Sequence, residues 1–346
     1  MSTRYADSRL PIPAEGLSRR DVLSIAWGRA SDPRAEHWIR VHRRAMACRF
    51  EITLSGERAS QIPAAREALE EAERLEALLS VFRATSEISR INQHAGLGDI
   101  TASDAVVGLL VRCQEMSAAT GGAFDITSTP LSRCWGFLRR EGRLPADAEI
   151  SEALSLVGMD KLSCDCDTNR VALSTAGAAI NLGAVGKGFA VQAIGAALWL
   201  RRVREALVSA GSSSVLALGG QGDGWLVDVT TSGPTRRVLA RLRLRNAALG
   251  TSGTGEQFVE VDGRRYGHIL DPRTGRPASG VLNATVVTTD AASADALATA
   301  FFVGGIDLAR SYCDAHPGTL ALVTPDDQSW RPRVVGRYHG ALVEEP

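Results

Sequence analysis

The sequence has few features typical of nucleic-acid-binding or membrane proteins. Lysine and arginine total 39, and aspartate and glutamate also total 39, so no net charge attracts nucleic acid. Aromatic residues make up only 5% of the chain and do not cluster with basic ones. No apolar run approaches the roughly 18 residues that a membrane span needs. These absences predict no nucleic-acid partner and no transmembrane segment. Because the net charge is zero, any anionic ligand must be held by side chains and main-chain groups close to it.

The six cysteines show no spacing typical of a disulfide framework. Only Cys164 and Cys166 lie close together, and their C-D-C spacing fits neither a zinc knuckle nor a redox C-x-x-C. We therefore expect free thiols in a reducing compartment.

The first 37 residues have little periodicity and are expected to form a tail or a decayed leader. Ser18-Arg19-Arg20 resembles a twin-arginine export signal, but the segment after it is too short and too charged for the apolar part of such a signal. We expect a cytoplasmic protein, with export as the alternative.

The rest of the chain has ample apolar content for a core, with 45% hydrophobic residues overall. Strands and helices come in clusters without regular β-α-β alternation, which predicts an α+β layered domain and not a doubly wound sheet. No repeat or linker divides residues 38–340, so they are expected to form one unit before a short tail at 341–346. Periodicity predicts helices at 60–79, 105–119, 189–200 and 292–302, strands at 48–54, 206–209, 214–218, 225–230, 238–244 and 281–288, a hairpin at 257–270, and a polar insertion at 139–170.

Asp295 and Thr299 lie four residues apart in an alanine-rich helix. Their side chains therefore project from the same helical face, where both oxygens can reach one hard cation such as Mg²⁺. The alternative is that Asp295 complements the helix dipole while Thr299 bonds to a carbonyl of its own helix.

Three further segments combine glycine with polar side chains. Residues 181–188 read N-L-G-A-V-G-K-G before a helix, where main-chain N–H groups can approach a phosphate or simply form a tight turn. Residues 266–277 place His268 and Asp271 before two arginines, as in a base and phosphate clamp or in an ordinary rigid turn. Residues 121–127 set a Phe and an Asp beside two glycines, which is either a ligand loop or only a helix cap followed by a core Phe.

Together and in this order, these segments resemble the ApbE family of FAD:protein FMN transferases. The resemblance also includes residues 79–92 with L-S-V-F-R, Trp135-Gly136-Phe137 and Thr251-Ser252-Gly253, and it covers nearly the whole chain after the tail. It implies a layered ApbE-like α+β fold (T-fold-like) with mixed or antiparallel sheets and packed helices. It also implies contacts of FAD with Met46, Phe82, Ala123, Phe124, Asp125, Asn181, Lys187 and Ile269.

The resemblance further implies a Mg²⁺ site formed by Asp295, Thr299 and the main-chain carbonyl of Ala184. Mg²⁺ would orient the pyrophosphate of FAD, the substrate, while a Ser or Thr hydroxyl in a loop of an acceptor flavoprotein attacks the FMN phosphorus and AMP leaves. His268 is the candidate base, with Asp271 as its orienting or alternative group.

Three positions depart from the family pattern. Asn181 stands where Asp is common, Ala184 replaces a small or hydroxyl residue, and Gly211-Ser212-Ser213-Ser214 lacks the acidic residue expected after a glycine pair. Two other functions stay open: hydrolysis of FAD to FMN and AMP with water as the acceptor, and non-catalytic FAD binding.

Overall fold

One antiparallel sheet forms the centre of the molecule. The computed structural model describes residues 22–26, 38–220, 224–231, 237–254, 258–261, 264–327 and 329–344. Within them, nine strands pair in the order β1-β2-β3-β7-β8-β11-β14-β15-β16, each antiparallel to its neighbours. Their bounds are β1 (Val22–Ala26), β2 (Trp38–Ala45), β3 (Cys48–Ser55), β7 (Ala206–Ala210), β8 (Ser214–Leu218), β11 (Ala247–Gly253), β14 (Val281–Thr288), β15 (Leu320–Pro325) and β16 (Arg333–Gly336).

Both faces of the central strands are covered, which explains why these strands read as nearly continuous apolar runs. In β14, every side chain from Asn283 to Val287 is buried. A second sheet, β17-β10-β9, lies over one face, and Trp225, Leu242, Leu249 and Val287 belong to the core between the two sheets. Its strands are β9 (Trp225–Thr230), β10 (Val238–Leu244) and β17 (Ala341–Glu344).

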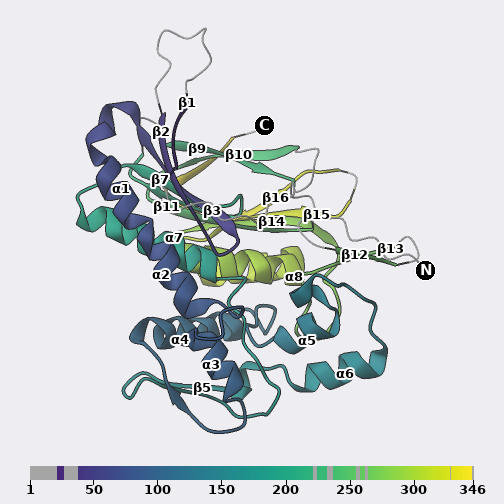
Figure 1. Ribbon diagram of the computed structural model, residues 1–346. Helices are drawn as coiled ribbons and strands as arrows, with labels where there is room; N and C mark the ends of the chain where they lie inside the picture. Colours follow the sequence, from purple (N-terminus) through teal and green to yellow (C-terminus); the bar gives the residue numbers. More distant parts are fainter. Residues whose placement is uncertain are drawn as a thin grey trace.

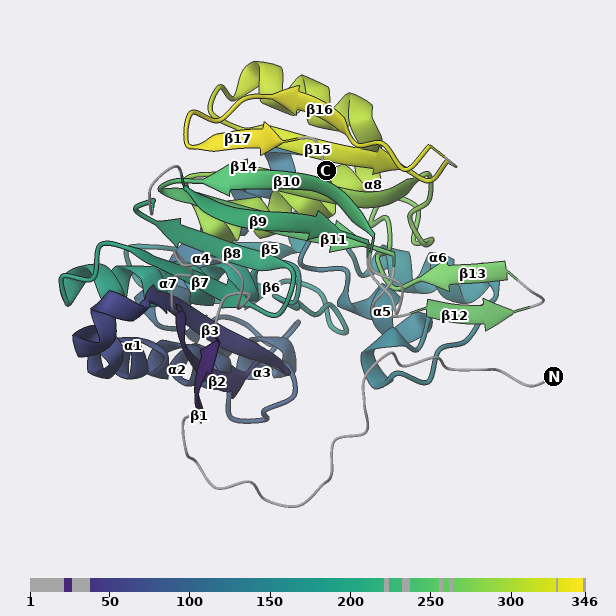
Figure 2. The same cartoon turned by 90° about the horizontal axis from the view of Figure 1, so that it is seen from above.

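Two long helices cover the opposite face of the main sheet. Figure 1 shows α7 (Gly186–Leu200) and α8 (Ala291–Ala315) beneath the strands, and Figure 2 shows the same layers from above. α8 packs mainly on β11 and β14, and α7 packs on α8, β7 and β8. Small residues on α8 allow the close approach, because Ala294, Ala296, Ala298 and Ala300 are all buried.

The remaining helices complete the domain around these two. α1 (Ile62–Ala68) and α2 (Glu70–Leu79) contact α7, and α4 (Asp104–Ala119) contacts α8 from below in the view of Figure 1. A smaller core around Trp135 joins α5, α6 and the hairpin of β12 and β13. The other elements are η1 (Gly56–Gln61), α3 (Glu87–Gln93), β4 (Ile100–Thr101), α5 (Thr129–Cys134), η2 (Phe137–Arg139), α6 (Asp147–Ser155), η3 (Met159–Lys161), β5 (Leu162–Asp165), β6 (Arg170–Leu173), β12 (Phe258–Val261) and β13 (Arg264–Gly267).

The predicted α+β class is confirmed, and most predicted elements are present. The helix expected at 60–79 is instead a 3-10 turn followed by α1 and α2, because Pro63 is favoured at the start of a helix. The expected insertion at 139–170 contains α6 and β5.

Two segments expected as tails form strands. β1 pairs with β2, and β17 pairs with β10, so both extend the sheets. Neither run is long enough for periodicity to reveal it. Ser18-Arg19-Arg20 and the hairpin turn expected at Asp262-Gly263 lie outside the described residues.

α8 is the one helix in the described ranges that is long and apolar enough to cross a membrane. Its most apolar stretch is 56% buried inside the protein. Gly305, with φ 70°, interrupts the helical backbone of α8, and Cys313 beyond it still packs against Gly336 of β16. The six cysteines are free thiols, as predicted.

Candidate active site

Asp295 is the best-defined polar group between α8 and the sheet. Only 6% of the residue is exposed. Its carboxylate accepts hydrogen bonds from the Gly188 N–H at 2.6 Å and from Ser214 Oγ, which lies 2.8 Å from each carboxylate oxygen. Burial raises the pKa of Asp295 to about 7, against the opposing effects of Lys187 and of these hydrogen bonds. A positive charge beside this carboxylate would therefore stabilise its ionised form.

Thr299 lies one helical turn after Asp295, at the position that the i, i+4 spacing predicts. Its Oγ1 is 3.1 Å from Ser252 Oγ and 3.3 Å from the Asp295 carbonyl oxygen. This bond to a carbonyl of its own helix is one half of the alternative interpretation of Asp295 and Thr299. The other half, in which Asp295 complements the dipole at the start of the helix, is not observed. Asp290, and not Asp295, caps the helix by accepting from the Ser293 N–H.

The glycine-rich loop reaches Asp295 from the start of α7. A Cβ atom at Gly188 would lie 2.1 Å from the Ala291 carbonyl oxygen, so only glycine permits this approach of α7 to α8. Ala184 is half-buried in the same loop, and the N–H groups of Val185 and Gly186 both bond to the Leu182 carbonyl. The loop and the helix are therefore brought together, as the predicted metal site requires.

Lys187 and Asn181 stabilise this loop. Lys187 Nζ bonds to Ser213 Oγ, just before the start of β8. Asn181 Oδ1 accepts from the Gly183 N–H at 2.9 Å, which is the local turn that asparagine and aspartate both favour. The substitution of Asn for Asp thus keeps the turn while it removes a negative charge.

The loop at residues 121–127 lies beside the glycine-rich loop, because the Asn181 N–H donates to the Ile126 carbonyl at 2.8 Å. Ala123 and Phe124 are each only 1% exposed, so little of either residue is open to a ligand. Gly121, Gly122 and Asp125 are more accessible. Asp125 accepts from Thr127 through N–H and hydroxyl, and burial raises its pKa.

The His268 turn approaches the same region. A Cβ atom at Gly122 would lie 3.8 Å from Cγ of Arg273. Asp271 binds the Arg273 guanidinium with both carboxylate oxygens, at 2.8 and 2.9 Å. Trp135 Nε1 donates to the Gly275 carbonyl at 2.9 Å and attaches the turn to α5. His268 and Ile269 follow β13 directly and are half-buried.

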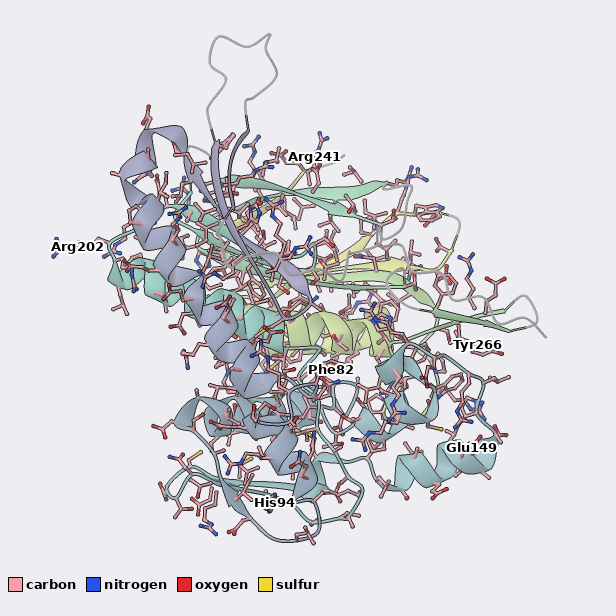
Figure 3. The ribbon with its side chains drawn as sticks, in the orientation of Figure 1. Phe82, His94, Glu149, Arg202, Arg241 and Tyr266 are labelled. Atoms are coloured by element: carbon pink, nitrogen blue, oxygen red, sulfur yellow. The ribbon has the colours of Figure 1, made fainter. Side chains whose placement is uncertain are left out.

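Phe82 and Met46 lie on two other loops. Phe82 follows α2 and is 76% exposed, an unusual position for a large aromatic side chain. Figure 3 labels it below the ribbon of α8. Met46 and Ala47 form the two-residue turn between β2 and β3, with φ 48° and 56°, a conformation that normally favours glycine or asparagine. The predicted contacts of both residues with FAD stay predictions.

The sequence did not identify Ser214 or Gly250 as parts of this site, and Ser252 was noted only within the Thr251-Ser252-Gly253 motif without a role. Each lies on a central strand facing α8, and Ser214 pairs with Gly250 across β8 and β11. Ser214 was noted only where an acidic residue was expected. The alternation within β8 would have placed it on a face, but not beside Asp295.

Comparisons with known proteins agree with this arrangement. The sequence profile of the ApbE family matches residues 46–324. A FAD:protein FMN transferase of Klebsiella pneumoniae (strain 342) is 31% identical over 236 residues, covering 68% of this chain and 73% of the relative. One of Vibrio cholerae is 27% identical over 258 residues, covering 73% and 77%. The crystal structure of the ApbE protein of Thermotoga maritima has a TM-score of 0.75 at 29% identity, covering 89% of this chain and 96% of that one. On these grounds the chain belongs to the ApbE family.

Proposed function

We propose that this protein transfers FMN from FAD to a Ser or Thr hydroxyl on an acceptor flavoprotein, with Mg²⁺ and with release of AMP. The observation that carries the proposal is the bond of the Gly188 N–H to Asp295, which joins the glycine-rich loop to the carboxylate of α8. Relatives named FAD:protein FMN transferase support the reaction class.

The oxygens at this point fit a hard cation. Asp295 would supply a carboxylate, Thr299 a hydroxyl and Ala184 a main-chain carbonyl, which are the kinds of oxygen ligand that Mg²⁺ prefers. The described residues contain no cluster of three or more His, Cys, Asp or Glu that could hold a metal. When bound, Mg²⁺ would neutralise charge on the pyrophosphate as AMP departs.

The remaining steps belong to the chain's own residues. The acceptor hydroxyl forms a new P–O bond to the FMN phosphorus, and the bond from that phosphorus to the AMP oxygen breaks. His268 accepts the hydroxyl proton as general base. Asp271, which binds the Arg273 guanidinium through both carboxylate oxygens, is the orienting or alternative group.

Incubation of the pure protein with FAD and Mg²⁺, with and without an acceptor, tests the proposal. AMP release only with an acceptor, together with its gain of FMN, is the expected result. AMP release at the same rate without an acceptor would identify a hydrolase, and bound but intact FAD would identify a non-catalytic binder.

Replacing His268 by alanine is expected to lower the transfer rate by roughly 10²- to 10⁴-fold, the usual contribution of a general base. FAD affinity should change much less. Stopped-time assays of AMP release and titration of flavin fluorescence separate the two effects. His316→Ala, an exposed histidine that stacks on Tyr312 at the end of α8, is the control. A loss of FAD binding alone would make His268 a cofactor ligand.

Replacing Phe82 by alanine is expected to weaken FAD binding about tenfold through lost stacking. The melting temperature should not change, because the side chain is 76% exposed. Leu200→Ala, at an 81% exposed position on α7, serves as the control. Equal FAD affinity in the wild type and the Phe82 variant would rule out the predicted stacking.

A further inference from the structure

Ser214 is a buried hydroxyl whose contacts suggest a specific task. It is 0% exposed, and its Oγ lies 2.8 Å from both carboxylate oxygens of Asp295. A serine hydroxyl has one proton to donate, so its hydrogen bond to the carboxylate fixes the orientation of that group. The Gly188 N–H fixes the same group from the side of α7.

The position of this hydroxyl is set by the sheet and not by a loop. Ser214 begins β8 and pairs with Ala210 of β7 and Gly250 of β11. A Cβ atom at Gly250 would lie 2.4 Å from the carbonyl carbon of Ala294, so β11 and α8 are in direct backbone contact. The hydroxyl and the carboxylate are therefore held by rigid elements, as a preorganised site needs.

The nearby lysine is directed elsewhere. Lys187 Nζ bonds to Ser213 Oγ, and within the described part of the chain it forms no ion pair with Asp295. The Asp295 carboxylate is thus oriented by a neutral hydroxyl and a neutral amide. Among the described residues no cation is in direct contact with this carboxylate, and the charge of Lys187 lowers its pKa from a distance, so the carboxylate can still attract a cation.

We propose that Ser214 is a positioning residue for metal binding: it aligns the Asp295 carboxylate so that the carboxylate can bind Mg²⁺. The inference rests on the proposed function, since it concerns the same cation. Hydrogen bonds to a metal-binding carboxylate from such outer groups typically change metal affinity by about 10- to 100-fold. Ser214 acts through Asp295 and does not itself touch the metal.

Thermal unfolding of the full chain at increasing Mg²⁺, with FAD present and no acceptor, measures the apparent Mg²⁺ affinity without an activity assay. Ser214→Ala is expected to shift the half-saturating Mg²⁺ concentration upward by roughly 10- to 100-fold. Ser214→Thr, which keeps the hydroxyl, should restore the affinity at least in part. Ser209→Ala is the matched control, because Ser209 on β7 pairs with Val215 and so faces away from Asp295.

The outcomes separate the inference from the proposed function. If the wild type shows no Mg²⁺-dependent stabilisation, the metal site itself is wrong. If the wild type and Ser214→Ala respond to the same Mg²⁺ concentrations, Ser214 is only structural and the inference fails. Should Ser214→Ala not fold, Ser214→Cys keeps the side-chain volume while it replaces the hydroxyl by a weak donor, and it must show the same loss of affinity.

Discussion

Asp295→Ala is expected to lower Mg²⁺-dependent FMN transfer by on the order of 10³-fold, because it removes the one carboxylate of the predicted metal site and with it several kcal/mol of charge stabilisation. The variant should fold, since alanine fits the tightly packed face of α8 formed by Ala291, Ala294 and Ala298. AMP release measured across a Mg²⁺ titration checks the prediction, with circular dichroism as the test of folding.

A matched control lies on the same helix. Asp307 has a side chain that is 91% exposed, so Asp307→Ala removes an equal charge far from the sheet and should leave transfer unchanged. Full activity of the Asp295 variant at limiting Mg²⁺ would show that the metal, or the site, is misassigned.

Gly250→Ala is expected to destabilise the fold by about 3 kcal/mol, the upper part of the range for overpacked cores. Its Cβ would lie 2.4 Å from the carbonyl group of Ala294 and 2.5 Å from the amide nitrogen of Asp295. These are backbone atoms of α8, which cannot move without displacing the carboxylate. Urea unfolding should show the loss of stability, and the Mg²⁺ response should weaken with it.

The same substitution at Gly108, Gly108→Ala, is expected to have the opposite effect on the stability of the fold. Gly108 lies within α4, and a Cβ there would have no atom within 4 Å. Alanine is the better helix former, so this variant should be more stable than the wild type by about 0.5–1 kcal/mol. If both substitutions have the same effect on stability, the close contact between β11 and α8 is not as described.

The sequence pattern was sufficient to predict those parts of the site that lie within a single helix or loop. The i, i+4 spacing of Asp295 and Thr299 places both on the sheet-facing side of α8, because helical geometry fixes that relation. The glycines at 183–188 likewise indicate a close backbone approach, and at Gly188 the structure shows the contact that requires it.

The contacts between distant elements could not be read from the sequence. Ser214 meets Asp295 only because β8 and β11 are neighbours on the face of the sheet that α8 covers, and strand order is not encoded in periodicity. Ala123 and Phe124 belong to a motif that implies ligand contact, yet each is almost fully buried in the core. The pairing of Asp271 with Arg273 depends on a turn geometry that spacing alone does not determine.

Strand pairing also explains the differences at the ends of the chain. β17 pairs with β10, which lies far back along the sequence, and β1 pairs with the next strand, β2, so short runs without strong alternation become strands. In contrast, the long α4 and α7 helices carry their own signal and were predicted to within three residues at their starts.

The central claim is that Asp295, Thr299 and the Ala184 carbonyl hold a divalent cation beside the pyrophosphate of FAD. Anomalous diffraction from crystals grown with FAD and Mn²⁺, a close substitute for Mg²⁺, tests it most directly. We expect one strong peak within bonding distance of all three oxygens and of the pyrophosphate. A pyrophosphate bound elsewhere, or a peak that contacts neither Asp295 nor Thr299, would contradict it.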